Sequence, residues 1–404
     1  MSRAGKPGGR QVGVLFLIVF IDLVGFGMVI PILPLYAEKY DPPGWLFGLF
    51  MASFSAMQFI FSPLLGGLSD RIGRRPVLVI SMAGAAVGYA LLAVADSMTL
   101  LFASRIVAGV CGANIATAQA VIADLTGPEG RTRAMGIIGA AFGLGFIFGP
   151  ALGGLLVHYG EAWPGVAASV ASLTAAALVF ILLPETRTLR EGPASPRRRL
   201  DWAVLTEVLR DPLLGLCLLL ILLVITAFSA FETTFAQFLL AVYGFEPRQI
   251  AFLFVYAGVL AAIVQGGLVG RLSRRFGEAR LIVFGVVLAG LSLGALPLVG
   301  GLPVMLVVLA GLALGIGMTT PSLASLTSQL APADRVGRVM GQYQSLSSLG
   351  RIIGPFVAEI AFAASIGLPS FAGSTLLATG ACLALLLLLR LRKMGRLTPV
   401  GGAG

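Results

Sequence analysis

The stretch GGLSDRIGRR at residues 66–75 recurs 200 positions later as GGLVGRLSRR at residues 266–275. The two copies share both glycines, the leucine and all three arginines, and each copy lies between two long apolar stretches. Asp70 of the first copy is replaced by Gly270 in the second. A charged repeat between hydrophobic segments indicates a duplicated membrane protein, whose copies share a shape but differ in chemistry.

Composition places the chain in a lipid bilayer. Of its 404 residues, 57% are hydrophobic and 11% are charged, and the mean hydropathy is +0.97. A helix needs about 20 apolar residues to cross a membrane. The sequence predicts twelve such helices, at 13–35, 45–68, 76–95, 98–122, 133–157, 163–183, 212–241, 248–270, 280–298, 303–328, 338–362 and 369–391.

The net charge of +10 reflects membrane topology rather than nucleic acid binding. In the twelve-helix prediction, Lys39 and Arg248 fall on one side of the membrane, and Arg105 and Arg351 lie inside helices. The other 24 of the 28 Lys and Arg residues fall on the opposite side. The positive-inside rule therefore predicts that both termini are cytoplasmic. Basic clusters separated by membrane spans form no continuous groove for nucleic acid.

The longest hydrophilic stretch lies in the middle of the chain. We expect a six-helix bundle at 1–185, a cytoplasmic linker at 186–211 and a second six-helix bundle at 212–404. The halves also match at 123–136 with 328–341 and at 146–156 with 351–361, in both cases 205 positions apart. The predicted fold is an all-α membrane protein with two bundles related by a parallel pseudo-two-fold axis, an arrangement typical of secondary transporters.

Residues for metal or catalytic chemistry are scarce. The chain has a single histidine, and its three cysteines, Cys111, Cys217 and Cys382, fall in apolar segments without metal-ligand spacing. The sequence contains no Ser–His arrangement and no motif of paired carboxylates. We therefore expect no enzymatic activity and no bound metal. The first apolar run lacks a cleavage pattern and is predicted to be a span rather than a signal peptide.

Four motifs carry a resemblance to a known family. GGLSDRIGRRPVLV at 66–79 resembles the family's motif A, LLFASRIVAGVCGAN at 100–114 resembles motif B with Arg105 as its arginine, and IDLVGFGMVIPILPLYA at 21–37 resembles its first span. The glycines of the fifth predicted span resemble motif C, the signature of exporters. The chain is similar to the twelve-span drug/proton antiporters of the major facilitator superfamily, in the branch of the tetracycline exporters.

The motif C helix combines small residues with a proline. Small residues let helices approach closely in lipid, and a proline within a helix removes a backbone hydrogen bond and bends it. Helix packing alone is one interpretation, and a hinge or seal is the other. The resemblance assigns the hinge to Gly136, Gly145, Gly149, Pro150, Gly153 and Gly154.

The resemblance implies a secondary active exporter that exchanges protons for a small lipophilic or amphiphilic compound by alternating access. The proton gradient would be its energy source, with no cofactor, and its partners would be substrate, protons and lipid. A monomer in a bacterial inner membrane is expected. The alternative is a carrier of the same fold for a metabolite or lipid-like solute, without proton coupling. Gly88, Ala261 and Ala289 replace titratable residues of the tetracycline exporters, which argues against tetracycline as the substrate.

Asp70 has two possible roles. It is either a solvated loop carboxylate or an anion placed against a helix N-terminus, where the helix dipole favours negative charge. The resemblance favours the second, with residues 336–338 as the partner and with Asp124 paired to Arg71 or Arg75. The resulting cytoplasmic latch would comprise Gly66, Asp70, Arg71, Gly73, Arg74, Arg75 and Asp124.

An ionisable residue at membrane depth is a functional candidate because its insertion costs at least about 2.5 kcal/mol. Asp22 lies near the middle of the first span, and Arg105 enters the fourth span from the opposite side. We expect the two to pair in at least one conformation. A movable arginine would change the carboxylate's proton affinity, which makes a proton switch. A static ion pair is the alternative.

Glu232 in the seventh span is the third residue assigned to proton coupling. It either faces a cavity, where Phe228, Phe231 and Phe235 would form an aromatic wall for a lipophilic cation, or lies solvated at the outer interface. Arg351 would attract an anionic group or neutralise Glu232. The substrate-cavity candidates are Asn114, Phe228, Phe231, Phe235, Gln237, Gln344 and Arg351.

Overall fold

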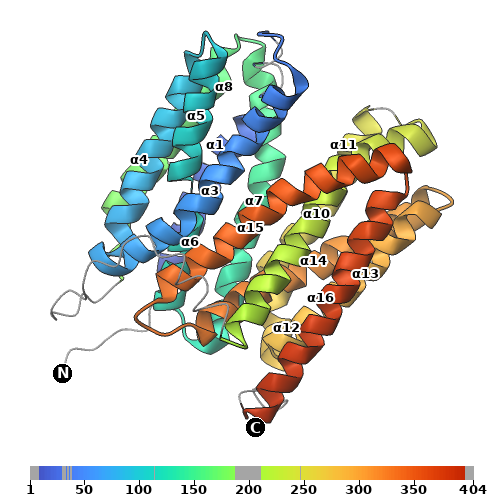
Figure 1. The fold of residues 1–404 in the computed structure, drawn as a ribbon. Coiled ribbons are helices and arrows are strands. Elements are labelled where there is room, and N and C mark those ends of the chain that lie inside the picture. The colour runs from blue at the N-terminus through green and yellow to red at the C-terminus, as the bar shows by residue number, and fades with distance from the viewer. Residues whose placement is uncertain are drawn as a thin grey trace, which may run out of the picture. The chain divides into compact units, whose positions relative to one another are not determined.

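The computed structural model of the chain describes residues 9–29, 33, 36, 39–112, 114–186, 211–245 and 247–395, and within them every regular element is helical (Figure 1). Residues 187–210 of the predicted linker lie outside this part. The elements are α1 (Gly9–Val29), α3 (Gly44–Ile72), α4 (Arg74–Ala93), α5 (Met98–Cys111), α6 (Asn114–Leu125), α7 (Pro128–Val157), α8 (Ala162–Leu182), α10 (Leu214–Tyr243), α11 (Pro247–Ile263), the π-helical η2 (Val264–Leu268), α12 (Val269–Phe276), α13 (Glu278–Ala295), the 3₁₀ turn η3 (Leu296–Leu298), α14 (Leu302–Leu330), α15 (Val336–Ala364) and α16 (Leu368–Lys393).

The helices agree with the predicted membrane-spanning class. Among the described residues, 11 helical stretches are long and apolar enough to cross a bilayer. In addition, the 30-residue α7 covers the predicted fifth span. The fourth span consists of α5 and α6, and the eighth of α11, η2 and α12. The single π-turn in the eighth span is notable because such turns are frequent at functional sites.

Helix contacts divide the chain into two compact units. In the first unit, α4 packs against α5 and α8, and α1 packs against α8. In the second unit, α13 packs against α14 and α16, and α10 packs against α16. The first unit contains Met1–Gly127, Ala141–Trp202 and Ala331–Ser345, and the second contains Pro128–Ala140, Ala203–Leu330 and Leu346–Gly404. The beginning of α7 therefore belongs to the second unit, and the beginning of α15 belongs to the first.

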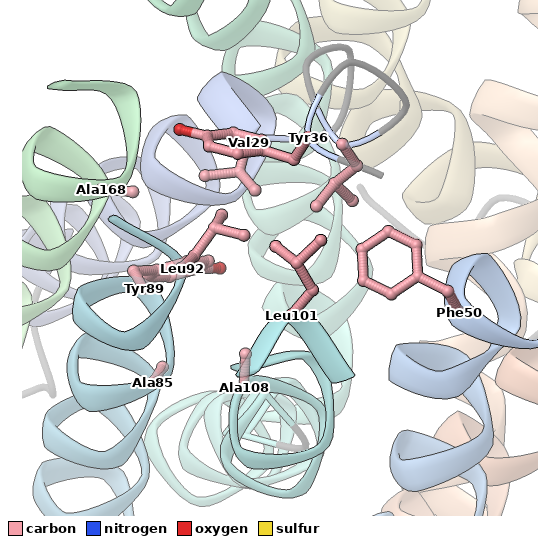
Figure 2. Close-up of a cluster of buried hydrophobic side chains, with 10 residues drawn as sticks. Val29, Tyr36, Phe50, Ala85, Tyr89, Leu92, Leu101, Ala108 and Ala168 are labelled. Carbon is pink, nitrogen blue, oxygen red and sulfur yellow. The ribbon is translucent and has the colours of Figure 1, made fainter. Parts of the chain in front are cut away.

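A cluster of buried side chains joins five elements of the first unit (Figure 2). Tyr89 of α4 and Phe50 of α3 are its largest rings together with Tyr36, whose hydroxyl donates to the backbone carbonyl of Glu161. Aliphatic side chains complete the cluster, and small residues among them, such as Ala108 of α5 and Ala168 of α8, let the helices approach closely. Association of helices in lipid depends on such van der Waals packing because lipid tails are as apolar as the side chains.

Gly88 shows how closely two helices of the first unit approach. A Cβ atom built on Gly88 of α4 would lie 2.8 Å from the backbone nitrogen of Ala108 in α5. No side chain fits this gap without separating the helices. This is the position where the resemblance would place a carboxylate, and the packing leaves no room for one.

We predict that Gly88→Ala destabilises the protein by about 1–3 kcal/mol, because the added methyl group overpacks the α4–α5 contact. Gly13→Ala is the matched control, since a Cβ on this exposed helical glycine meets nothing within 4 Å. Unfolding in detergent, followed by circular dichroism, measures both variants. Equal stability of Gly88→Ala and Gly13→Ala would contradict the close helix contact.

Candidate functional site

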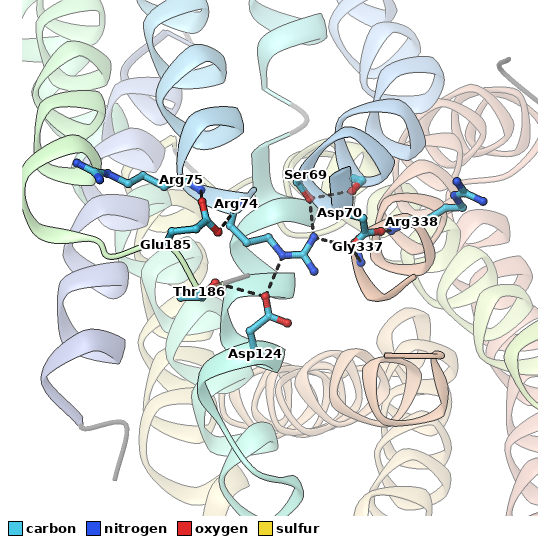
Figure 3. A network of polar contacts seen from close by, with 10 residues as sticks. Ser69, Asp70, Arg74, Arg75, Asp124, Glu185, Thr186, Gly337 and Arg338 are labelled. Atoms are coloured by element: carbon cyan, nitrogen blue, oxygen red, sulfur yellow. Dashed lines mark hydrogen bonds and ion pairs between the residues drawn. The ribbon is translucent and has the colours of Figure 1, made fainter. Parts of the chain in front are cut away.

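Arg74, the first residue of α4, lies at the centre of a polar network in the first unit (Figure 3). Its side chain is 0% exposed, and its Nη1 lies 2.7 Å from Oδ1 of Asp70 and 2.7 Å from Oγ of Ser69. Its Nε donates to Oδ2 of Asp124 of α6 at 2.9 Å. A buried guanidinium is tolerated only when charges and hydrogen bonds compensate for its lost hydration. We call Ser69, Asp70, Arg74, Asp124, Gly337 and Arg338 the Arg74 network.

Asp70 also accepts hydrogen bonds from the start of α15. The backbone N–H of Gly337 donates to Oδ1 at 2.9 Å, and that of Arg338 donates to Oδ2 at 2.8 Å. These amides belong to the first helical turn, which has no acceptors within its own helix. The contact expected between Asp70 and residues 336–338 is therefore present. A Cβ on Gly66 would overlap the carbonyl oxygen of Gly337, so the close approach requires glycine.

The predicted partner of Asp124 is wrong. Arg74, rather than Arg71 or Arg75, forms the ion pair. Arg71 is exposed at the end of α3, and Arg75 is directed at the ring and carbonyl oxygen of Phe180 in α8. The reversal of chain direction at Gly73, whose φ is +104°, places Arg74 between α3 and α6.

Glu185 is a part of this region that sequence reasoning missed. Its two carboxylate oxygens accept the backbone N–H groups of Arg74 and Arg75, at 2.9 and 3.1 Å. The negative charge thus stabilises the N-terminus of α4. The only available signal was an acidic residue directly after the sixth span, and its partner is 111 positions away.

Asp22 of α1 is held by neutral donors. Asn114 of α6 donates through Nδ2 to Oδ2 at 3.0 Å, and Ser172 of α8 donates through Oγ to Oδ1 at 3.0 Å. Asn114, predicted as a cavity residue, is 3% exposed and positions this carboxylate. Ser172 was not predicted, because one serine in an apolar span carries no signal before the helices are packed.

Arg105 does not form the predicted ion pair with Asp22 in this structure. Its side chain is 1% exposed, and its guanidinium lies over the rings of Phe54 and Tyr89, 5.4 and 5.9 Å from their centroids. Its Nε and Nη2 have no hydrogen-bond partner among the described residues. Tyr89 lies within electrostatic range of both Asp22 and Arg105. Tyr89 thus contacts the guanidinium of Arg105 with its ring and lies within electrostatic range of Asp22.

Three motif C glycines of α7 pack against α1, the helix that carries Asp22. A Cβ on Gly145 would lie 2.8 Å from Cβ of Leu23, a Cβ on Gly149 would lie 2.6 Å from Cα of Gly27, and a Cβ on Gly153 would overlap Met28. Gly136 packs instead against Gln265 of η2 in the second unit. Gly154 faces open space, so it is not part of the contact. Pro150 lies within α7, but its side chain lies outside the described part.

Charged and polar groups of the seventh and eleventh spans lie near one another in the second unit. Glu232 of α10 is exposed and interacts electrostatically with Arg351 of α15. Glu359 of α15 accepts a hydrogen bond from Nε2 of Gln237 at 2.9 Å. Gln237 is exposed as predicted for a cavity residue, and Arg351 is partly exposed.

The predicted aromatic wall is mostly internal packing. Phe231 and Phe235 are 7% and 2% exposed, and Phe235 lies edge-on against Phe254 of α11. Only Phe228 of the three predicted rings is partly exposed. Gln344, another cavity candidate, is 4% exposed in the first unit. Phe231, Phe235 and Gln344 are therefore buried in this structure. For the two phenylalanines, helical spacing in the sequence does not distinguish such burial from a cavity wall.

Known proteins are similar to this chain in sequence and in fold. The chain is 34% identical over 364 residues to the class G tetracycline resistance protein of Vibrio anguillarum, covering 87% of this chain and 90% of that protein. It is 29% identical over 363 residues to multidrug resistance protein 2 of Bacillus subtilis (strain 168), covering 88% and 90%. The structure matches the human organic anion transporter MFSD10 (TETRAN) with a TM-score of 0.84 and 27% identity, covering 93% of this chain and 99% of that one.

The family follows from these matches and from the helices described above. The sequence matches the profile of the Major Facilitator Superfamily over residues 15–355, which is most of the chain. Transport rather than enzymatic chemistry is common to the superfamily and to the relatives. The chain therefore belongs to the Major Facilitator Superfamily of membrane transporters.

Proposed function

We propose that this transporter is a proton-coupled exporter of small lipophilic or amphiphilic compounds in a bacterial inner membrane. The relatives named for tetracycline and multidrug resistance support export of drug-like compounds. The observation that carries proton coupling is the environment of Asp22, a carboxylate at membrane depth whose hydrogen-bond donors are the neutral groups of Asn114 and Ser172.

The coupling mechanism depends on a change of partners. The proton affinity of a carboxylate falls when a cation approaches it and rises when the cation withdraws. Arg105 is held on aromatic rings and retains unused N–H donors. A displacement of α1 against α5 that brings Arg105 from the rings of Phe54 and Tyr89 to Asp22 would release the proton. At the contact between α7 and α1, the glycines of α7 carry no side chains that would obstruct such a displacement of α1.

The second unit supplies the candidate substrate contacts. Glu232 and Arg351 present charges of both signs from α10 and α15, and the partly exposed ring of Phe228 lies one turn from Glu232. A lipophilic cation would interact with the carboxylate and the ring, while an anionic group would interact with the guanidinium. Amphiphilic compounds with a charged end fit this set better than neutral solutes do.

The Arg74 network completes the transport cycle. The positive-inside rule places it on the cytoplasmic side. Its hydrogen bonds from Gly337 and Arg338 hold the start of α15 to the first unit. We assign this network to closing the cytoplasmic side while the outer side is open.

The central role of Asp22 predicts the behaviour of Asp22→Asn. Export of ethidium, a lipophilic cation, driven by a pH gradient in proteoliposomes should fall to the level of protein-free vesicles, because the amide cannot carry the proton. Exchange of internal for external ethidium should continue, because alternating access is retained. Asp96→Asn, at an exposed loop carboxylate, is the control and should export normally. Gradient-driven export by Asp22→Asn at the wild-type rate would exclude Asp22 from the mechanism.

The latch predicts a local effect of Asp70→Asn. Loss of a hydrogen-bonded charge facing the first turn of α15 should raise amide hydrogen exchange at residues 336–345 by about tenfold or more, because bonds to charged groups contribute about 1.5–3 kcal/mol. Asp334→Asn removes a nearby carboxylate that is 73% exposed, and it should leave exchange there unchanged. Unchanged exchange in Asp70→Asn would show that Asp70 does not hold the start of α15 and that the motif is only a tight basic turn.

A further inference from the structure

A second polar network begins at Glu278, at the corner between α12 and α13. The 200-position repeat pairs Arg74 with Arg274, and this corner lies four residues further along the chain. Gly73 and Gly277 both have positive φ angles, +104° and +82°, and each ends one helix and precedes the next. The residue after Gly73 is Arg74, and the residue after Gly277 is Glu278. The helices that follow these two corners therefore begin with residues of opposite charge.

Glu278 connects three helical segments of the second unit. Its Oε1 lies 2.8 Å from Oγ1 of Thr132 near the start of α7, and 3.1 Å from Nε2 of Gln329 of α14. Oγ of Ser325, also in α14, lies 2.9 Å from the Thr132 hydroxyl and 3.0 Å from Nε2 of Gln329. Thr132 and Ser325 are both 0% exposed. We call Thr132, Glu278, Ser325 and Gln329 the Glu278 network.

Hydrogen-bond chemistry fixes the direction of each bond in this network. An ionised carboxylate only accepts, so Thr132 and Gln329 donate to Glu278. The single hydroxyl hydrogen of Thr132 is then used, so Ser325 must donate to the oxygen of Thr132. The second amide hydrogen of Gln329 satisfies Ser325. The four side chains form a closed ring with no conflict of donors.

The two networks occupy matching places in the repeat. Thr132 and Gly337 are 205 positions apart, as are Asp124 and Gln329. In the first unit the cation Arg74 donates to Asp124, and Gly337 donates its backbone N–H to Asp70. In the second unit the anion Glu278 accepts from Gln329 and from Thr132. The geometry of the corner is kept while its charge is inverted.

The position of the anion in the second unit has a steric explanation. The residue that matches Asp70 in the sequence repeat is Gly270, and a Cβ there would lie 2.5 Å from Cβ of Arg133 of α7. A side chain at position 270 would therefore collide with α7. Glu278, at the start of the next helix, provides the negative charge instead.

We propose that the Glu278 network is a second cytoplasmic latch, in which Glu278 holds the beginning of α7 to the second unit through the Thr132 hydroxyl. Glu278 and Thr132 are positioning residues of the transport cycle: they fasten Pro128–Ala140, the part of α7 that packs with the second unit, while the rest of α7 packs with the first. This inference rests on the exporter proposed above, in which each latch holds its own helix start and both must be released before the cytoplasmic side can open.

Amide hydrogen exchange of the full-length protein in nanodiscs tests this proposal. Thr132→Val, which keeps the side-chain shape but removes the donor, should raise exchange at residues 131–140 by about tenfold or more. Exchange at residues 336–345, held by Asp70, should stay unchanged. Thr132→Ser restores the hydroxyl and should exchange like the wild type. Glu278→Ala, which removes the acceptor oxygens, should reproduce Thr132→Val, and the double variant should exchange no faster than either single variant.

Thr319→Val is the matched control, because Thr319 is equally buried and its hydroxyl donates to Gly315 of its own helix. It should leave exchange at 131–140 unchanged. If Thr132→Val fails to fold, Glu278→Ala carries the test alone. Wild-type exchange at 131–140 in Glu278→Ala, or equal loosening of 131–140 and 336–345 in either variant, would overturn the proposal. Neither result depends on substrate or protons, so failure of the latch is distinguishable from failure of the proposed export function.

Discussion

The buried guanidinium of Arg74 is the constraint on which this corner of the structure depends. A charge removed from water must be compensated by fixed partners, and breaking a buried pair costs about 3–5 kcal/mol. Asp70 and Asp124 supply that compensation from two other helices. Because Asp70 also accepts two amides of α15, the cation that fixes α3, α4 and α6 also fixes the start of a distant helix.

The same principle organises the membrane interior and the second half. Asp22 and Arg105 both lie in the first unit. Asp22 is hydrogen-bonded to neutral side chains, and Arg105 lies over aromatic rings, so neither is paired with an opposite charge. Such groups are poised for an exchange of partners when the helices move. Glu278 repeats the arrangement with inverted sign, so duplication has preserved the geometry of a corner while its chemistry has diverged.

Much of the fold follows from the sequence because the bilayer permits few solutions. Apolar runs of sufficient length must be helices, and the repeated motif indicates which connections are equivalent. The contact of Asp70 with the start of α15 also followed, through the family resemblance. The sequence did not reveal that Arg74, rather than Arg71 or Arg75, pairs with Asp124, because this pairing depends on the rotation that Gly73 imposes on the next helix. Ser172 and Tyr89 were missed because their roles arise only when separate helices pack together. Phe231 and Phe235 are buried in the structure, and their place at a cavity stays a prediction, because burial against a neighbouring helix and exposure to a cavity produce the same spacing.

The central claim is that substrate binding is linked to a proton on Asp22. Calorimetric titration of the purified protein with ethidium, repeated in buffers of different ionisation enthalpy, counts the protons released per ligand bound. We predict a heat that varies with the buffer for the wild type and a heat independent of the buffer for Asp22→Asn. Equal proton release by both proteins would contradict it.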